Sequence, residues 1–118
     1  GPKGAAALAE GLKGNSTLQS LDLSDNGLGP KGAAALAEGL KGNSTLQSLD
    51  LEENFIGVEG ASALAAVLKE TMISNLILCS NDISDQAKQA VRDAAGNGVS
   101  IRFDRFEMPR QIRDAACN

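Results

Sequence analysis

Hydrophobic and polar residues follow two alternating spacings along this chain. Within residues 2–14 the apolar residues recur at i, i+3, i+4 and i+7, the spacing of one helical face: Ala5, Leu8, Ala9 and Leu12. Within residues 18–23 they alternate around Asp22, as expected for a short strand with one buried face. The letters S-D-N-G then predict a turn. The pattern therefore predicts a helix followed by a strand.

The helix-and-strand pattern recurs, and its first two copies share an identical stretch. The letters GPKGAAALAEGLKGNSTLQSLDL occupy residues 1–23 and return unchanged at residues 29–51. Two further helical faces are Ala61, Leu64, Ala65 and Leu68, then Ala87, Ala90, Val91, Ala94 and Ala95. A last strand is expected over residues 99–103, where Val99, Ile101 and Phe103 alternate with polar residues. Internal repetition therefore decides the architecture.

The recurrence defines four expected units, at residues 1–28, 29–56, 57–83 and 84–104. Because a helix connects each strand to the next, the strands should run parallel in one sheet with the helices on one side. Residues 105–118 are expected to form a short capping helix, with a partner-binding tail as the alternative.

The strand segments carry the motif L-x-x-L-x-L-x-x-N-x-L. It occurs three times, with Ile replacing Leu at some positions: Leu18, Leu21, Leu23, Asn26 and Leu28; Leu46, Leu49, Leu51, Asn54 and Ile56; Ile73, Leu76, Leu78, Asn81 and Ile83. In this motif the chain resembles leucine-rich repeat proteins of the ribonuclease-inhibitor type, whose 28-residue repeats also occur in NOD-like receptors. The resemblance implies an α/β solenoid, a short right-handed horseshoe segment with parallel strands on the concave face and helices on the convex face.

The motif asparagines Asn26, Asn54 and Asn81 are expected to have a structural role. The turn that leaves each strand has backbone groups that neither helix nor sheet satisfies. A stack of asparagine side chains can donate to and accept from these groups, whereas a buried amide without partners would be costly. We therefore interpret these residues as a structural ladder and not as ligand-binding groups.

The resemblance also implies a protein-binding surface on the concave face. Its candidate residues flank the strand leucines: Ser20, Asp22, Ser24, Ser48, Asp50, Glu52, Asn75, Ile77, Cys79, Ser100, Arg102 and Asp104. Their character changes from acidic in the first two units to mixed and partly apolar in the last two. Four short strands supply only part of the roughly 800 Å² that each partner buries in a typical interface.

The first helix has the sequence of an internal one, so the strand at residues 18–23 should leave an open edge. Exposed strand edges favour pairing with another chain. We therefore expect a homo-oligomer formed through the N-terminal edge as a further property of the chain.

The composition argues against catalysis. The chain has no His, Tyr or Trp, which removes the usual general base and the commonest zinc ligand. Its two cysteines, Cys79 and Cys117, have no metal-ligand spacing and define no disulfide framework. The letters GLKGNST lack the order of a phosphate-binding loop. We therefore expect no enzymatic activity, no metal and no cofactor.

Charge and hydropathy limit the partners further. The net charge is −4, and every arginine lies in residues 92–118, interleaved with acids that would oppose nucleic-acid binding. No signal peptide is visible, and no apolar run reaches membrane length. We therefore expect neither a nucleic-acid nor a membrane partner, and a cytoplasmic location.

These observations together predict a non-catalytic protein–protein interaction module, a fragment of a longer leucine-rich repeat protein. The alternative is an engineered or recently duplicated structural solenoid whose main property is folding or self-assembly. The identical copies favour this alternative, because they include surface positions that tolerate drift, such as Lys3, Glu10 and Gln19.

Overall fold

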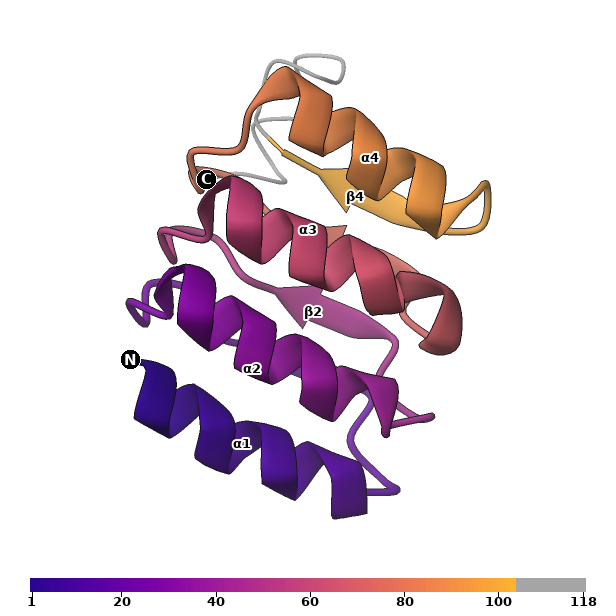
Figure 1. Ribbon diagram of the computed structural model, residues 1–118. Coiled ribbons are helices and arrows are strands. Elements are labelled where there is room, and N and C mark those ends of the chain that lie inside the picture. The colour runs from indigo at the N-terminus through magenta and orange to yellow at the C-terminus, as the bar shows by residue number, and fades with distance from the viewer. Residues whose placement is uncertain (104–118) are drawn as a thin grey trace.

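The computed structural model describes residues 1–103, which form four successive helix–strand units (Figure 1). The helices are α1 (Pro2–Gly14), α2 (Gly29–Lys41), α3 (Gly57–Val67) and α4 (Asp85–Ala95), and the short 3-10 helix η1 (Leu68–Glu70) extends α3. The strands are β1 (Ser20–Asp22), β2 (Ser48–Asp50), β3 (Asn75–Ile77) and β4 (Ser100–Arg102). They run parallel in the order β1-β2-β3-β4. The predicted α/β solenoid is confirmed. The capping helix expected at residues 105–118 lies outside the described residues.

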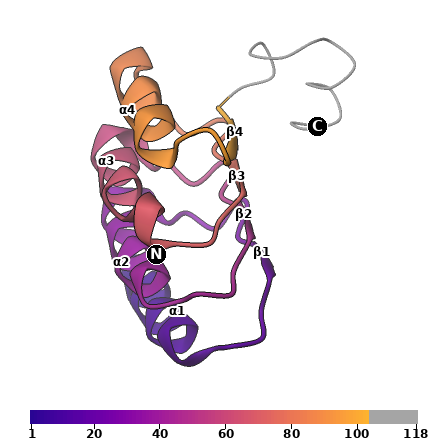
Figure 2. The same ribbon diagram turned by 90° about the vertical axis from the view of Figure 1, so that its right-hand side faces the viewer.

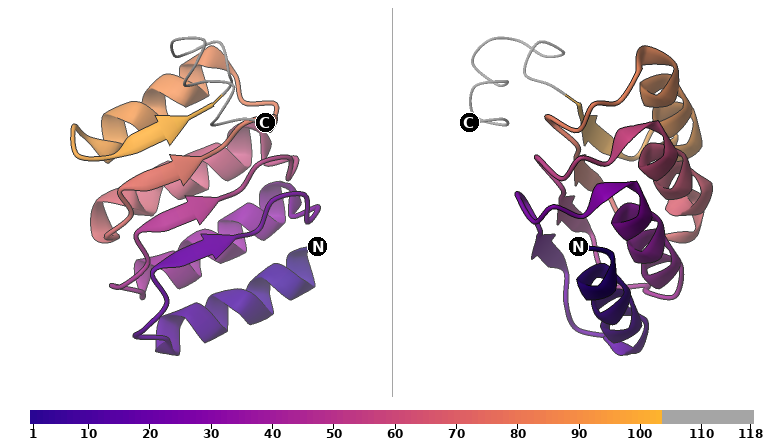
Figure 3. Two further views of the ribbon diagram at one scale, coloured as in Figure 1. Left: turned by 180° about the vertical axis from the view of Figure 1, so that it is seen from behind. Right: turned by 60° about the vertical axis from the view of Figure 1, so that its left-hand side comes forward.

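The molecule has two layers. All four helices lie on one face of the sheet, as Figure 2 shows from the side. The other face, seen from behind in Figure 3, is covered by no helix of residues 1–103. Neighbouring strands lie about 4.8 Å apart, whereas packed helices need about 8–10 Å. An array of such units must therefore bend, with the strands on the concave side.

The two layers enclose a core of aliphatic side chains. Four of them face the helices in register across the sheet: Leu21, Leu49, Leu76 and Ile101. The helices supply Leu36, Leu64 and Val91, each 0% exposed. Full burial of such a side chain contributes about 1.5–3 kcal/mol. The core is therefore a stack of leucine-sized side chains, one layer per unit.

Small residues let neighbouring helices pack closely. Gly39 of α2 faces Ala9 of α1, and a Cβ atom added at Gly39 would stand only 2.5 Å from the Ala9 Cα atom. Gly60 of α3 faces Ala33 of α2, whose Cβ atom would be 3.0 Å from an added Cβ. These glycines shorten the distance between helices, which limits the bending of the array.

Three details differ from the sequence pattern. The strands have three residues each, so β1 is shorter than the expected 18–23. Leu8 is only partly buried, because no described helix packs on the outer side of α1. Ala90 is exposed, although the pattern placed it on the buried face of α4. Ala87 and Val91 centre that face, and Ala90 lies at its border.

Candidate protein-binding face

The concave face presents two rows of side chains that cross the sheet in register. The first, here called the serine row, consists of Ser20, Ser48, Asn75 and Ser100. The second, the charged row, consists of Asp22, Asp50, Ile77 and Arg102. Both rows face away from the helices, because the residue between them in each strand packs in the core. All eight side chains are at least partly exposed.

Two side-chain hydrogen bonds involve the serine row, one of them between two of its members. Asn75 Nδ2 donates to Ser48 Oγ at 3.2 Å, across the β2–β3 boundary. Arg102 Nη1 donates to Ser100 Oγ at 2.7 Å, within β4. The guanidinium of Arg102 is therefore held along its own strand, at the end of the charged row farthest from Asp22.

The two aspartates of the charged row also shape the turns that follow their strands. Asp22 Oδ1 accepts a hydrogen bond from the backbone N–H of Ser24 at 2.9 Å, and Asp50 Oδ1 accepts from Glu52 at 3.0 Å. The backbone and side-chain hydrogen bonds of Ser24 lower the pKa of Asp22 below its ordinary value of 3.8. Asp22 and Asp50 pair in register on adjacent strands, so the face concentrates negative charge at β1 and β2.

The remaining four candidates lie beyond the strand ends. Ser24 and Glu52 are partly exposed, as expected for a binding face. Cys79 is only 2% exposed, so the expectation that its side chain is presented on the concave face is wrong. The reason is that β3 ends at Ile77 and the strand alternation stops there. Asp104 lies outside the described residues.

The motif asparagines lie in the turns between strand and helix. Asn54 Nδ2 donates to the Leu23 carbonyl at 2.8 Å, and its Oδ1 accepts from the backbone N–H of Asn26 at 2.9 Å. Asn81 bonds to the second turn in the same way, donating to the Leu51 carbonyl at 2.8 Å and accepting from the Asn54 N–H at 2.8 Å. The amides of Asn54 and Asn81 therefore each link their own turn to the turn of the preceding unit.

Asn43 links the second unit to the first at the opposite ends of the helices. Asn43 is 3% exposed, and its Nδ2 donates to the carbonyls of Leu12 and Asn15 at 2.8 and 3.1 Å. Its Oδ1 accepts from the backbone N–H groups of Thr45 and Leu46. The N-S-T letters that begin at Asn43 therefore lie in the turn between helix and strand, where Asn43 is buried, Thr45 is partly buried and Ser44 is exposed.

No group of three or more metal-ligating side chains gathers among residues 1–103. Within the same range no helix has the length and apolar character needed to cross a bilayer.

Residues 14–37 and 42–65 each match the family model described as "Leucine Rich repeat". The two matches begin 28 residues apart, and each runs from the end of one helix through a strand into the next helix. The chain contains leucine-rich repeats. Leucine-rich repeats are in general protein-interaction modules. No curated protein matches the chain significantly.

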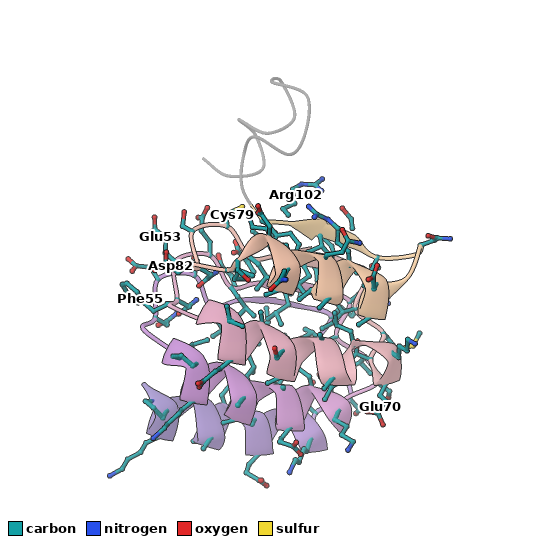
Figure 4. All side chains as sticks on the ribbon, turned by 45° about the horizontal axis from the view of Figure 1, so that its top comes forward. Glu53, Phe55, Glu70, Cys79, Asp82 and Arg102 are labelled. Carbon is teal, nitrogen blue, oxygen red and sulfur yellow. The ribbon has the colours of Figure 1, made fainter. Side chains whose placement is uncertain are left out.

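Sequence reasoning on these leucine-rich repeats missed one exposed aromatic side chain. Phe55 is 70% exposed and lies in the turn between β2 and α3 with φ of 56°. Figure 4 shows it on the same rim of the molecule as Glu53 and Asp82. The corresponding residue of the first repeat is Gly27, also at positive φ. Comparing the turns residue by residue could have identified the unusual Phe55.

Proposed function

We propose that this leucine-rich repeat chain is a non-catalytic protein-interaction module whose concave face binds a basic segment of a partner protein. One observation carries the proposal: Asp22 and Asp50 occupy the same register on adjacent strands, both outside the core. Like charges placed side by side on a sheet cost stability in the free chain. A cationic partner segment relieves that repulsion and gains from the complementary charge.

The charged row also indicates how the partner lies. It passes from Asp22 and Asp50 on β1 and β2 to Ile77 on β3 and Arg102 on β4. The partner segment therefore crosses the strands with its basic residues over β1 and β2 and its apolar or acidic residues over β3 and β4. Arginine and lysine are the side chains that fit the first half.

Phe55 enlarges the surface that four short strands provide. Large aromatic side chains are frequent anchors of protein interfaces, and an exposed phenylalanine gains most from being covered. In the proposed complex, Phe55 contacts apolar groups of the partner beside the basic segment. We further propose that the repeats are of the ribonuclease-inhibitor type, which the full helix of each unit supports.

Selection from a random peptide library against the immobilised chain tests this function. We expect the chain to enrich peptides rich in Lys and Arg. The test variant is the double substitution Asp22→Asn and Asp50→Asn, since each amide keeps the Oδ1 acceptor for the turn and removes the charge. The matched control is Glu10→Gln with Glu38→Gln, which removes two charges from corresponding exposed positions of α1 and α2.

The two double variants separate a local site from general charge attraction. We expect the aspartate variant to bind the selected peptides about tenfold more weakly or worse, a loss of about 1.4 kcal/mol, and the glutamate variant to bind within about twofold of the parent. Equal weakening in both variants, or selection of peptides without basic residues, would contradict the proposal.

A further inference from the structure

The concave face of the sheet is covered by no helix of residues 1–103 (Figure 3). Its charged row occupies the last residue of each strand: Arg102, Ile77, Asp50 and Asp22, from β4 to β1. In that direction the row changes from cationic through apolar to acidic. A segment that covers the row needs the complementary order, which is an acid, then an apolar residue, then two cations.

The acidic half of the row lacks a cation among residues 1–103. Asp22 and Asp50 each accept a hydrogen bond from a backbone N–H group of the following turn, and neither carboxylate forms an ion pair with another residue of this range. Glu52 follows β2 and adds a third carboxylate at the same end of the sheet. A cationic side chain placed here would therefore relieve the repulsion between the carboxylates.

The cationic side chains of the described residues lie elsewhere. All six lysines belong to the helices, on the other side of the sheet: Lys3, Lys13, Lys31, Lys41, Lys69 and Lys88. Arg92 also belongs to a helix, and its guanidinium lies over the ring of Phe103, 4.8 Å from the centroid. Arg102 donates to Ser100 at the far end of the row. The chain's other arginines are Arg105, Arg110 and Arg113.

Residues 104–118, here called the C-terminal segment, begin where they can reach the acidic half. They follow Phe103, one residue after the charged row ends at Arg102. Three strand spacings of about 4.8 Å separate the row positions on β4 and β1, about 14 Å in all. Residues 104–113 can span about 30 Å when extended. The C-terminal segment is therefore long enough to cross all four strands.

The order of side chains in the C-terminal segment complements the row. Glu107 comes first and is opposite in charge to the row residue on β4, and Met108 is apolar like the residue on β3. Arg110 and Arg113 follow and are opposite in charge to the residues on β2 and β1. Arg105 precedes Glu107 and stands outside this order, so we assign the contacts to the two later arginines.

We propose that the C-terminal segment binds across the concave face of its own chain, with Arg110 at Asp50 and Arg113 at Asp22, and competes there with the basic partner segment. This autoinhibition rests on the proposed function, because it assigns a regulator to the same binding face. In this arrangement the C-terminal segment covers the concave face and not the edge of β4, where the sequence pattern predicts a capping helix.

Tethering makes a weak contact sufficient for this competition. A segment joined to its binding face by a short linker is present at an effective concentration of about millimolar, so a contact of millimolar affinity occupies the face in about half of the molecules. The partner then binds more weakly, in proportion to the fraction of molecules whose face is open.

Fluorescence anisotropy of a labelled peptide with the sequence of residues 104–116 tests the proposal on the full chain. The test variant combines Arg110→Gln with Arg113→Gln and so removes two charges from the chain's own segment. The matched control combines Lys3→Gln with Lys31→Gln, at corresponding exposed positions of α1 and α2. We expect the test variant to bind the peptide about threefold more tightly than the parent, because its own segment competes less. The control should bind like the parent.

Three results of this experiment would overturn the proposal. Equal affinity of the parent and the test variant would show that the chain's own segment does not occupy the face. Failure of the peptide to bind the test variant would show that the segment does not recognise the face. Undiminished binding to the variant with Asp22→Asn and Asp50→Asn would place the peptide elsewhere.

Nuclear magnetic resonance distinguishes binding within one chain from binding between two copies. The backbone N–H groups of Ser24 and Glu52 donate to the Asp22 and Asp50 carboxylates, so their signals respond to a cation beside those carboxylates. We expect both signals to move in the arginine test variant and not in the lysine control, equally at low and high protein concentration. A difference that disappears on dilution would assign the contact to a second copy and overturn the proposal.

Separate outcomes distinguish this autoinhibition from the proposed function. Library peptides that are basic and bind the parent and the arginine variant equally would support the function and overturn the autoinhibition. Selection of no basic peptides by the arginine variant, together with the expected behaviour of the residue 104–116 peptide, would contradict the function and support the seating of the C-terminal segment.

Discussion

Replacement of Asn54 by alanine is the most direct test of how the turns hold the units together. Asn54 is 0% exposed and its side chain makes five hydrogen bonds. Without its Oδ1 atom, the N–H groups of Asn26 and Leu28 lose an acceptor. A buried donor left unpaired costs about 1–3 kcal/mol, so we expect a loss of about 4 kcal/mol of stability.

Asn26→Ala is the matched control, because the same residue type occupies the same turn position one unit earlier. Asn26 is exposed, and its two side-chain hydrogen bonds both lie within its own turn. Removal of the Asn26 side chain should lower the free energy of unfolding by about 1 kcal/mol. The comparison therefore isolates the contribution of the bonds that cross from one unit to the next.

Urea unfolding followed by circular dichroism measures both variants. A loss of about 4 kcal/mol, with a slope of about 1.5–2 kcal/mol per molar urea, lowers the midpoint of Asn54→Ala by about 2–3 M. Domains of this size are stable by about 5–15 kcal/mol, so the variant should still be largely folded in water. Equal midpoints for the two variants would refute the reasoning, because the bonds between units would then contribute nothing.

Three further predictions concern other parts of the structure. Gly39→Ala should destabilise the chain by about 1–3 kcal/mol through overpacking against Ala9, whereas Gly4→Ala, which has open space, should be neutral or stabilising in the same thermal melt. The Asp22 carboxyl should titrate below 3.8 by NMR, and Ser24→Ala should raise its pKa. Because the folded-state pKa is the lower one, the stabilisation from Asp22 is present above its unfolded pKa and is lost as the pH falls through the folded value; a pKa at or above 3.8 would contradict this. Phe55→Gly should raise the melting temperature, since glycine adopts its positive φ without strain, and should weaken binding of selected peptides; a lower melting temperature would show that Phe55 packs favourably in the free chain.

The spacing of apolar residues was sufficient to predict the order of the elements. Leu36, Leu64 and Val91 are buried on the helix faces that the 3.6-residue period identified. Leu49 and Leu76 are buried in strands that the two-residue period identified. Both periods report which side of an element faces the core, and burial of aliphatic side chains decides the fold.

The spacing of apolar residues did not predict the burial of side chains that lie beyond the ends of the helices and strands. Cys79 follows the alternation of its strand by counting, yet the strand has already ended and the residue is buried. Phe55 stands in a turn whose backbone conformation depends on the stacking of neighbouring turns, which no local pattern reports. The hydrogen bonds of Asn43 to the preceding unit likewise depend on tertiary placement.

The identical residues 1–23 and 29–51 have a consequence for the kinetics of folding. During folding either segment can stack first on α3 and β3, because both present the same side chains. If the first segment does so, residues 29–51 form a loop and one interface between units is missing. Closing such a loop costs only a few kcal/mol, so this trapped state should delay part of the population. A slow refolding phase should therefore diminish when the two segments are made different in sequence.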